Sequence, residues 1–153
     1  KEKLSVSGLY RPDGRPMPNG LIIRKLDADD IQEAAPMYPG FDNPDYIVDR
    51  IEAGAVYGAF LSDNTADDTI NTLAGIIGIH EEGSIGMLYV KPQYRHRKLA
   101  TALETYAFNR ALENGWIPYG QIIAGNEASM RLQESMGLHF SKSSVYWMTK
   151  NNA

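Results

Sequence analysis

The chain alternates between short apolar runs and longer stretches in which apolar residues recur at helical spacing. Short runs bounded by turn residues are typical of strands, and periodic stretches are typical of amphipathic helices. The pattern predicts strands over 21–26, 55–61, 73–80, 85–90, 117–124, 139–141 and 144–148. It predicts helices after Asp27, after Asn43, over 99–114 and after Asn126. The order β-α-α-β-β-β-α-β-α-β-β implies a mixed central sheet with helices on both faces, in the α/β (α+β) class.

Capping residues support the first two helices. Asp27 is placed as an N-cap with Asp30 at N3, and Asn43 as the next N-cap with Pro44 at N1. Gly54 follows the second helix as its C′ residue. Glycines at strand positions predict bulges or a close backbone approach. These glycines are Gly75, Gly78 and Gly86.

The first 20 residues differ from the rest. Leu4, Val6 and Tyr10 alternate as in a short strand, but residues 11–20 contain three prolines and two glycines, a composition typical of turns and linkers. We therefore expect residues 1–20 to be an N-terminal tail or linker, or the remnant of an upstream domain. Residues 21–153 are expected to form one domain. A first residue other than Met leaves open that the chain is part of a longer two-domain protein.

Composition adds little to the fold class but bears on partners. Hydrophobic residues make up 43% and charged residues 22% of the 153 residues, which is ordinary for a globular protein. The net charge of −4 gives no support for nucleic-acid binding. Cysteine is absent, and no apolar run approaches the ~18 residues of a membrane span. We expect a cytoplasmic protein with no metal, no membrane and no nucleic-acid partner.

A cationic loop joins the strand at 85–90 to the helix at 99–114. Five basic or titratable side chains follow one another within eight residues: Lys91, Arg95, His96, Arg97 and Lys98. The first N–H groups of a helix have no intrahelical partner, and the helix dipole favours negative charge there. The stretch therefore predicts an anion site. Taken alone, it is also compatible with a solvated basic surface.

The stretch LYVKPQYRHRKLATAL, within this order of elements, resembles the GNAT (GCN5-related) N-acetyltransferase superfamily. Its strand-loop-helix signature reads roughly V-x-P-x-x-R-G-x-G-[LIA]-[GA]. Five residues match the signature in register: Val90, Pro92, Arg95, Leu99 and Ala100. His96 and Lys98 stand where the signature prefers glycine, so the backbone of Lys98 must keep to a region allowed to other residues. The resemblance extends over roughly residues 21–149 and is specific from about 85 to 138.

A second segment carries a finer resemblance. The stretch from Asn126 to Leu138 looks like the second signature of the superfamily, and NGWIPYGQIIAGNEASMRLQESMGL is similar to FR47-like and glycine N-acyltransferase-like C-terminal domains. The resemblance implies the GNAT acyl-CoA N-acyltransferase fold, with acetyl-CoA or another acyl-CoA held between parallel strands at 85–90 and 117–123. The residues implied to bind it are Leu88, Tyr89, Val90, Arg95, His96, Arg97, Lys98, Leu99, Ala100, Thr101, Asn126 and Ser129.

Catalytic residues are harder to assign, because an attacking amine needs a base and the leaving thiolate needs an acid. Glu82 is the first candidate for the base and Glu81 the second, although EEGS is equally an ordinary polar turn. His80, at the end of the preceding strand, ranks below them. Many members of the superfamily carry a tyrosine acid where this chain has Gln133. Tyr146 and Ser129 are nearby substitutes, and solvent can also protonate a thiolate.

The predicted function is transfer of an acetyl or other acyl group from acyl-CoA to a primary amine of a small, amino-acid-like acceptor. Direct attack in a ternary complex needs no Ser nucleophile, and no such signature is present. The alternative is a non-catalytic acyl-CoA-binding or sensor module of the same fold. The acidic net charge counts against a nucleic-acid binder. The sequence does not identify the acceptor or the acyl-chain preference, and a homodimer is left open.

Overall fold

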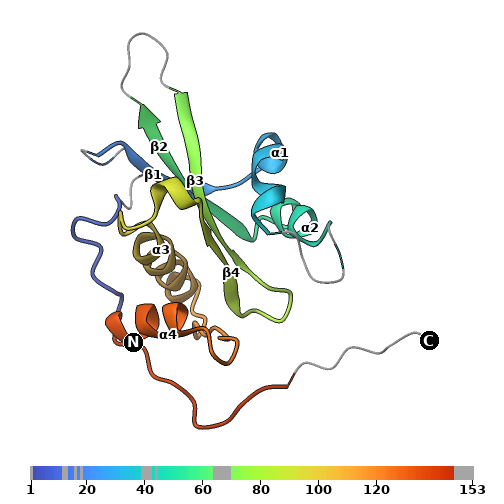
Figure 1. Cartoon of the computed structure of the whole chain (residues 1–153), viewed down its shortest axis with the longest axis vertical. Coiled ribbons are helices and arrows are strands. Elements are labelled where there is room, and N and C mark those ends of the chain that lie inside the picture. Colours follow the sequence, from blue (N-terminus) through green and yellow to red (C-terminus); the bar gives the residue numbers. More distant parts are fainter. Residues whose placement is uncertain are drawn as a thin grey trace. The chain divides into compact units, whose positions relative to one another are not determined.

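Two compact units make up the chain in the computed structural model (Figure 1). The structure describes residues 2–11, 14, 15, 17, 19–38, 43, 45–63 and 70–146. The first unit spans residues 1–121 and holds the sheet and most of the helices. The second unit spans residues 122–153 and holds α4 (Glu127–Ser135).

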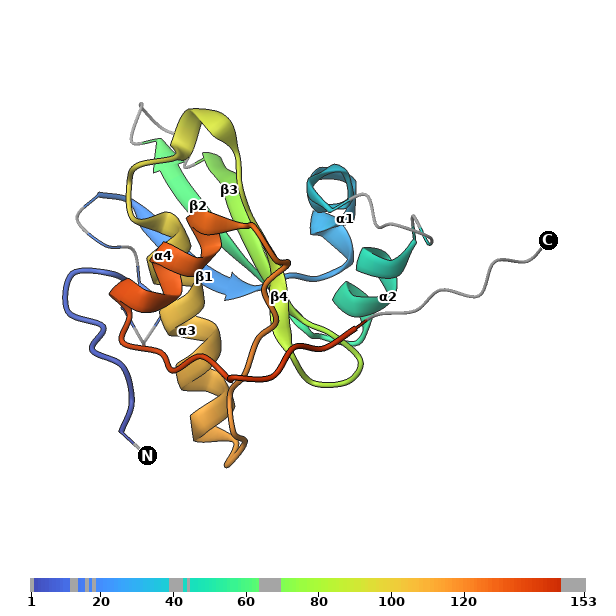
Figure 2. The ribbon, with the colours of Figure 1, turned by 60° about the horizontal axis from the view of Figure 1, so that its bottom comes forward.

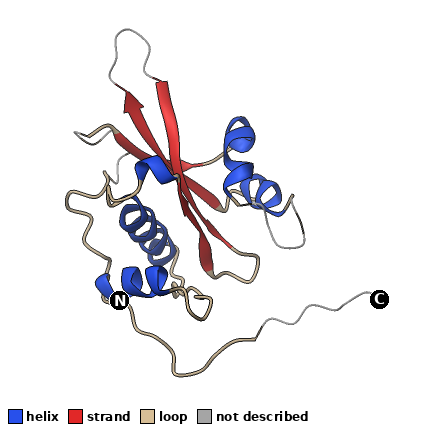
Figure 3. Ribbon diagram, in the orientation of Figure 1, coloured by secondary structure: helices blue, strands red, loops and turns tan. Residues whose placement is uncertain are grey.

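A four-stranded antiparallel sheet forms the centre of the first unit (Figure 3). Its strands are β1 (Leu21–Lys25), β2 (Val56–Asp63), β3 (Ile70–Ile79) and β4 (Ile85–Val90). They lie in chain order, so each strand pairs with the one that precedes it. Short apolar runs separated by polar turns favour such a meander. The strands predicted in these places are confirmed, and β3 begins earlier than expected.

The glycines of β3 and β4 lie beside two irregularities in the pairing, as predicted. Ile76 pairs with Tyr89 and Gly78 with Gly86, so Met87 and Leu88 together oppose Ile77. Met87 takes a left-handed backbone conformation there, with φ 54°. An extra residue of this kind bends its strand and redirects the backbone groups at its edge. The bulge therefore sets the direction of the second half of β4.

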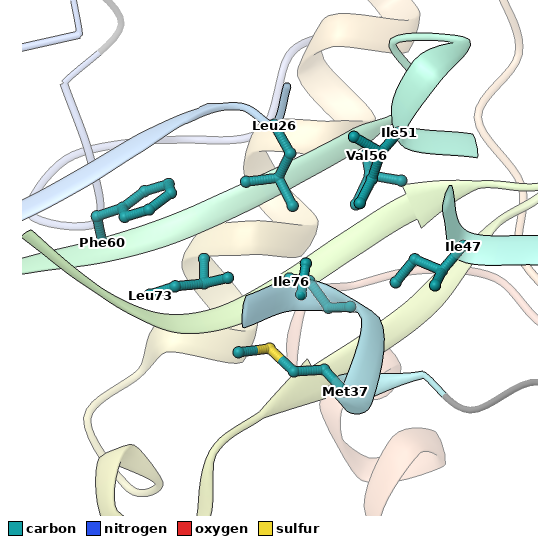
Figure 4. Close-up of a cluster of buried hydrophobic side chains, with 9 residues drawn as sticks. Leu26, Met37, Ile47, Ile51, Val56, Phe60, Leu73 and Ile76 are labelled. Carbon is teal, nitrogen blue, oxygen red and sulfur yellow. The ribbon is translucent and has the colours of Figure 1, made fainter. Parts of the chain in front are cut away.

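Helices cover both faces of this sheet, as predicted (Figures 1 and 2). On one face lie α1 (Ile31–Ala34), α2 (Tyr46–Glu52) and the 3-10 helices η1 (Ala28–Asp30) and η2 (Ala35–Met37). They share a buried cluster with the sheet (Figure 4), made of Leu26, Ala34, Met37, Ile47, Ile51, Val56, Phe60, Leu73 and Ile76. On the other face lies α3 (Leu99–Glu113), where the rings of Tyr106 and Tyr57 meet edge-on at 5.2 Å. Among the described residues, no helix is both long and apolar enough to cross a membrane.

The predicted helix ends are mostly confirmed. Asp27 caps η1, with its Oδ1 accepting from the Asp29 N–H at 3.0 Å and its own N–H donating to Asp30 at 3.0 Å. Gly54 ends the helical segment with φ 68°. The prediction for Asn43 is wrong, because the N-cap of α2 is Asp45. Asn43 instead accepts from the Asp45 N–H at 3.0 Å, which makes a turn ahead of the helix.

The N-terminal segment packs against α3 and forms no strand at its described residues 2–11, contrary to the alternation seen in the sequence. Asn109 holds it from α3: its side chain accepts from the Leu4 N–H at 2.8 Å and donates to the Leu4 carbonyl at 3.1 Å. The same amide donates to the Tyr10 hydroxyl at 3.2 Å. Tyr10 is buried, with its ring edge-on to Tyr106 at 5.1 Å. A side chain of α3 thus replaces the neighbouring strand that these residues would have needed.

The strands predicted at 117–124 and 139–141 are wrong, and the described part of the one predicted at 144–148 forms no strand. In place of a strand over 117–124 there is a single parallel bridge between Gly120 and Ile85, whose N–H donates to the Tyr119 carbonyl at 2.7 Å. Proline at 118 removes a donor and glycine at 120 weakens a strand. The described residues 139–146 form no hairpin, since serines bond locally: the Ser143 N–H donates to the Ser141 hydroxyl at 3.1 Å. Residues 147 and 148 of the expected hairpin lie outside the described residues.

A partly buried ion pair between Arg24 of β1 and Asp30 of η1 predicts a pH-dependent stability. The Asp30 carboxylate accepts from Arg24 at 2.7 and 2.8 Å and from the Asp27 N–H. The hydrogen bonds from Arg24, more than the opposing effect of burial, hold the pKa of Asp30 below its ordinary value. The ion pair therefore stabilises the folded protein fully above about pH 3.9, the pKa of aspartate in an unfolded chain. This stabilisation is lost as the pH falls through the lower pKa that Asp30 has in the folded protein.

We expect Asp30→Asn to lower the free energy of unfolding at neutral pH by about 1–3 kcal/mol, because Arg24 loses a charged partner. Urea unfolding at pH ~7 and pH ~3 measures the effect, since the stabilisation by the carboxylate begins to be lost once pH falls below the unfolded pKa. The difference between the wild type and the variant should shrink at the lower pH. An equal loss at both pH values would contradict this account.

Candidate acyl-CoA site

The turn between β4 and α3 leaves backbone donors without helical partners. After the 3-10 helix η3 (Pro92–Tyr94), residues 95–98 form a turn and α3 begins at Leu99. The first intrahelical hydrogen bond runs from the Ala102 N–H to the Lys98 carbonyl at 3.0 Å. The side chain of Lys98 does not cap the helix. The N–H groups of residues 99–101 therefore lie at the positive end of a 15-residue helix with no bond inside it.

Both residues that replace glycines of the signature are left-handed. His96 has φ 62° and Lys98 has φ 60° with ψ 17°. This is the small region allowed to residues with a Cβ, so the requirement stated for Lys98 is met at a cost. The turn keeps the backbone path that glycine would take. The side chains of His96 and Lys98 also add two basic or titratable groups near the N-terminus of α3.

The strained backbone at Lys98 predicts a gain in stability on return to glycine. We expect Lys98→Gly to raise the free energy of unfolding of the ligand-free protein by up to about 1 kcal/mol, the cost of a left-handed residue with a Cβ. Arg97→Gly is the matched control. Arg97 is exposed and is not left-handed, so glycine there should destabilise the protein by about 0.4–1 kcal/mol through the unfolded chain. Chemical denaturation compares the three proteins; a loss with both variants would contradict the strain.

A pocket of about 240 Å³ lies at this junction within the first unit. Its lining consists of Val90, Tyr94, Arg95, His96, Lys98, Leu99 and Ala100. Six of these seven residues were predicted from the sequence as binding residues, and Tyr94 was not. The Arg95 Nε donates to the Val90 carbonyl at 3.1 Å, which ties the turn to the end of β4. The pocket thus combines cationic side chains with unpartnered helix amides, the chemistry suited to a phosphate group.

Two of the cations in the sequence cluster, Lys91 and Arg97, do not line the pocket. Lys91 Nζ lies 2.6 Å from Glu33 Oε1 of α1, so this lysine joins the loop to the opposite helical layer. It does not line the pocket. The guanidinium of Arg97 lies 5.6 Å from the centre of the Tyr94 ring, a cation–π distance. The cationic surface at the pocket is therefore smaller than the sequence indicates.

Residues Leu88 and Tyr89 lie where the bulge redirects β4. Both are half-buried, and Tyr89 packs against the cluster shared with α1 and α2. On the side of β4 away from β3, Ile85 bridges Gly120 in parallel. The predicted pairing of this strand with the segment after 117 is thus present at one point. It lies at the start of β4, before the bulge.

The β3–β4 turn holds the two predicted glutamates. The Ser84 hydroxyl donates to the Glu82 carboxylate at 2.5 Å, and the Tyr119 hydroxyl donates to the Glu82 carbonyl at 2.6 Å. Burial raises the pKa of the Glu82 carboxyl, but the bond from Ser84, a backbone bond and the charges of His80 and Arg50 outweigh it and leave the pKa lowered. Glu82 is therefore ionised at neutral pH. The same stabilisation makes it a weaker base than an ordinary glutamate.

His80, which the sequence prediction ranked below the two glutamates, is held among aromatic side chains. Its Nδ1 is 3.0 Å from the hydroxyl of Tyr46 in α2, and its ring stacks on that of Tyr46 with centres 5.8 Å apart. The ring of Tyr38 meets it edge-on at 6.3 Å. Burial lowers the pKa of His80, and the charge of Glu82 raises it by less. Tyr46 and Tyr38 precede His80 by 34 and 42 positions in the sequence, so no local pattern could have revealed these neighbours.

The second unit holds the remaining predicted residues. Asn126 caps α4, with its side chain accepting from the Ser129 N–H at 3.1 Å, as the sequence predicted. Gly137 follows with φ 74° as the C′ residue. Tyr146 is 84% exposed. The roles of these residues toward acyl-CoA stay predictions. Among the described residues, no group of three His, Cys, Asp or Glu side chains could hold a metal ion.

The model of the acetyltransferase (GNAT) family matches residues 23–138. The chain belongs to that family. This confirms the resemblance and the fold predicted from it, and it makes the chain an acyl-group transferase by family. The match covers both the cationic turn and the segment that begins at Asn126. The finer likeness to FR47-like domains stays a prediction.

Solved structures show the same fold at low identity. A Drosophila protein is 22% identical with a TM-score of 0.64, and the alignment covers 80% of this chain and 40% of that one. The ribosomal-protein-alanine N-acetyltransferase from Brucella melitensis is 20% identical with a TM-score of 0.61, covering 86% and 99%. An aminoglycoside N-acetyltransferase solved with CoA is 12% identical with a TM-score of 0.63, covering 89% and 99%. No curated protein sequence matches the chain.

Proposed function

We propose that this GNAT family member transfers an acetyl or other acyl group from acyl-CoA to a primary amine of a small molecule. The observation that carries the proposal is the pocket at the start of α3, where helix amides without intrahelical partners meet Arg95, His96 and Lys98. A pyrophosphate has the charge and the acceptor oxygens that such a site favours. CoA in a structure of an aminoglycoside N-acetyltransferase with the same fold supports the choice of ligand.

In this proposal the pyrophosphate lies against the amides of residues 99–101, and the pantetheine arm follows the edge of β4. Strand amides there pair with the arm as with an added strand. The amide of Leu88, on the bulge, donates to the carbonyl oxygen of the thioester as negative charge develops. Asn126 and Ser129 of the second signature remain candidates for contacts with the pantetheine from the sequence. The acceptor enters from the face covered by α1 and α2.

The reaction itself needs no covalent enzyme intermediate. The nitrogen of the amine forms a bond with the thioester carbon and gives up a proton to a base, the carbon–sulfur bond breaks, and the thiolate takes a proton from solvent. Tyr146 remains a candidate acid from the sequence. A thiol pKa of about 8.5 makes the thiolate a tolerable leaving group near neutral pH. Glu82 and Glu81 remain candidates for the base from the sequence. The exposed carboxylates of the turn also favour the approach of a cationic amine.

Two measurements test the proposal on the purified protein. Acetyl-CoA should raise the thermal midpoint, whereas NAD and ATP should have little effect, because a ligand stabilises only the state it binds. Release of free thiol across a panel of primary amines then separates an enzyme from a module that only holds acyl-CoA. Stabilisation by acetyl-CoA without thiol release from any amine would favour the binding module. No stabilisation at all would refute the site.

A further inference from the structure

The ring of His80 bridges α2 and β4 on the face of the sheet where α1 and α2 lie. Its Nδ1 meets the Tyr46 hydroxyl at 3.0 Å, and its Nε2 faces the backbone of β4 at Gly86. A Cβ added to Gly86 would lie 2.6 Å from Nε2, so only glycine leaves room for the ring there. The absence of a side chain at Gly86 therefore allows an imidazole nitrogen to rest against the strand proposed to bind acyl-CoA.

The backbone around His80 is fixed on both sides. Its N–H donates to the Ser84 carbonyl at 2.8 Å and its carbonyl accepts from the Gly83 N–H at 2.9 Å. The guanidinium of Arg50 donates to the Ile79 carbonyl at 2.9 Å, which ties α2 to the same point. The Glu81 N–H donates to the Tyr46 hydroxyl at 3.3 Å, so that hydroxyl is itself held in place. The imidazole is thus oriented by neighbours whose own positions are set, as a proton-transferring group requires.

We propose that His80 takes the proton from the attacking amine at Nε2, with Tyr46 as the positioning residue at Nδ1. This role rests on the acyl transfer proposed above. As the nitrogen–carbon bond forms, the nitrogen becomes more acidic and its proton passes to Nε2. The carbon–sulfur bond then breaks, the thiolate takes a proton from solvent, and the imidazolium releases one to solvent. The proton balance is therefore closed without any further reactant.

The charges around His80 agree with a neutral imidazole in the resting protein. The ring faces Tyr46 and Arg50 from α2, Tyr38 from the segment after η2, and Glu82 from its own turn. Burial lowers the pKa of His80, Glu82 raises it and Arg50 lowers it further, and the outcome lies below the ordinary value. A histidine with such a pKa is unprotonated at neutral pH and can accept a proton.

The test measures kcat/KM against pH for the wild type, His80→Gln, Tyr46→Phe and Glu82→Gln, with the binding of acetyl-CoA measured in parallel. We expect His80→Gln to lower kcat/KM by about 10²- to 10⁴-fold and to remove the acidic limb of the profile. The thermal shift with acetyl-CoA should be unchanged. Tyr46→Phe should lower kcat and keep the acidic limb, because the base remains but its ring is no longer held.

Glu82→Gln separates the two candidate bases. If His80 is the base, loss of the negative charge lowers the pKa of His80, so the acidic limb moves to lower pH and activity at pH ~8 falls less than about threefold. If Glu82 is the base, this variant loses activity at every pH while His80→Gln keeps most of it, and the inference is overturned. Gly86→Ala, which displaces the ring without removing it, provides a second test should His80→Gln fold poorly. A wild type that releases no thiol from any amine would instead refute the proposed function.

Discussion

Replacement of Ala100 by aspartate is expected to weaken the binding of acetyl-CoA by at least about 10²-fold while leaving the protein folded. Ala100 is the second residue of α3 and lines the pocket between β4 and the helix. A carboxylate there would lie within a few ångströms of the proposed pyrophosphate. Two like charges about 4 Å apart near a protein surface repel by up to about 4 kcal/mol, and each 1.4 kcal/mol is a factor of ten in affinity.

The same carboxylate should stabilise the ligand-free protein. Acidic residues in the first turn of a helix interact favourably with its dipole, typically by about 0.3–1 kcal/mol. Ala100→Asn is the matched control, because it has the same shape without the charge. Titration calorimetry with acetyl-CoA, together with thermal unfolding of the free proteins, gives both quantities. Equal affinities for the Asp and Asn variants would show that no phosphate binds at this helix.

Truncation of Ile76 to alanine is expected to destabilise the first unit by about 2–5 kcal/mol, through lost burial and the cavity left behind. Ile76 is fully buried in β3, within the cluster shared with α1 and α2. Its cross-strand neighbour in β4 is Tyr89. Such a loss is a large part of the 5–15 kcal/mol that typically separates folded and unfolded states. Urea unfolding followed by circular dichroism measures it.

Two controls show whether the effect comes from the cavity. Ile76→Val removes one methylene and should cost about 0.5–1.5 kcal/mol. Ile22→Ala acts at a partly buried side chain on the edge of the same cluster, so its cost should lie below that of Ile76→Ala. If all three variants lost the same stability, burial in this cluster would not explain the effect.

Local patterns were sufficient to predict most of the first unit. The apolar runs of β1 to β4, the cap at Asp27 and the C′ glycine at Gly54 all depend on neighbours in the chain, and all are confirmed. The pocket residues could be predicted because strand, loop and helix follow one another without interruption. The bulge beside Gly78 and Gly86 was expected from glycine alone, although its position at Met87 was not.

What depends on distant partners could not be predicted. Lys91 was counted with the cationic loop because its ion partner, Glu33, is 58 residues away. His80 was ranked below the glutamates because its ring contacts, stacked on Tyr46 and edge-on to Tyr38, come from residues distant in the sequence. The alternation of Leu4 and Tyr10 indicated a strand, but the partner that satisfies them is Asn109 of α3. A pattern of apolar residues says that a face is buried, and not which element buries it.

The chain-order pairing of the four strands has a consequence for how the protein is made. Among the described residues, every hydrogen-bonded strand partner lies between Leu21 and Val90, apart from the bridge to Gly120, so the sheet can be completed while the remainder is still being synthesised. The face that carries Tyr57 stays uncovered until α3 has followed. Incompletely covered sheets expose apolar surface to other chains. The interval between the end of β4 and the end of α3 is therefore when the nascent chain is most open to aggregation.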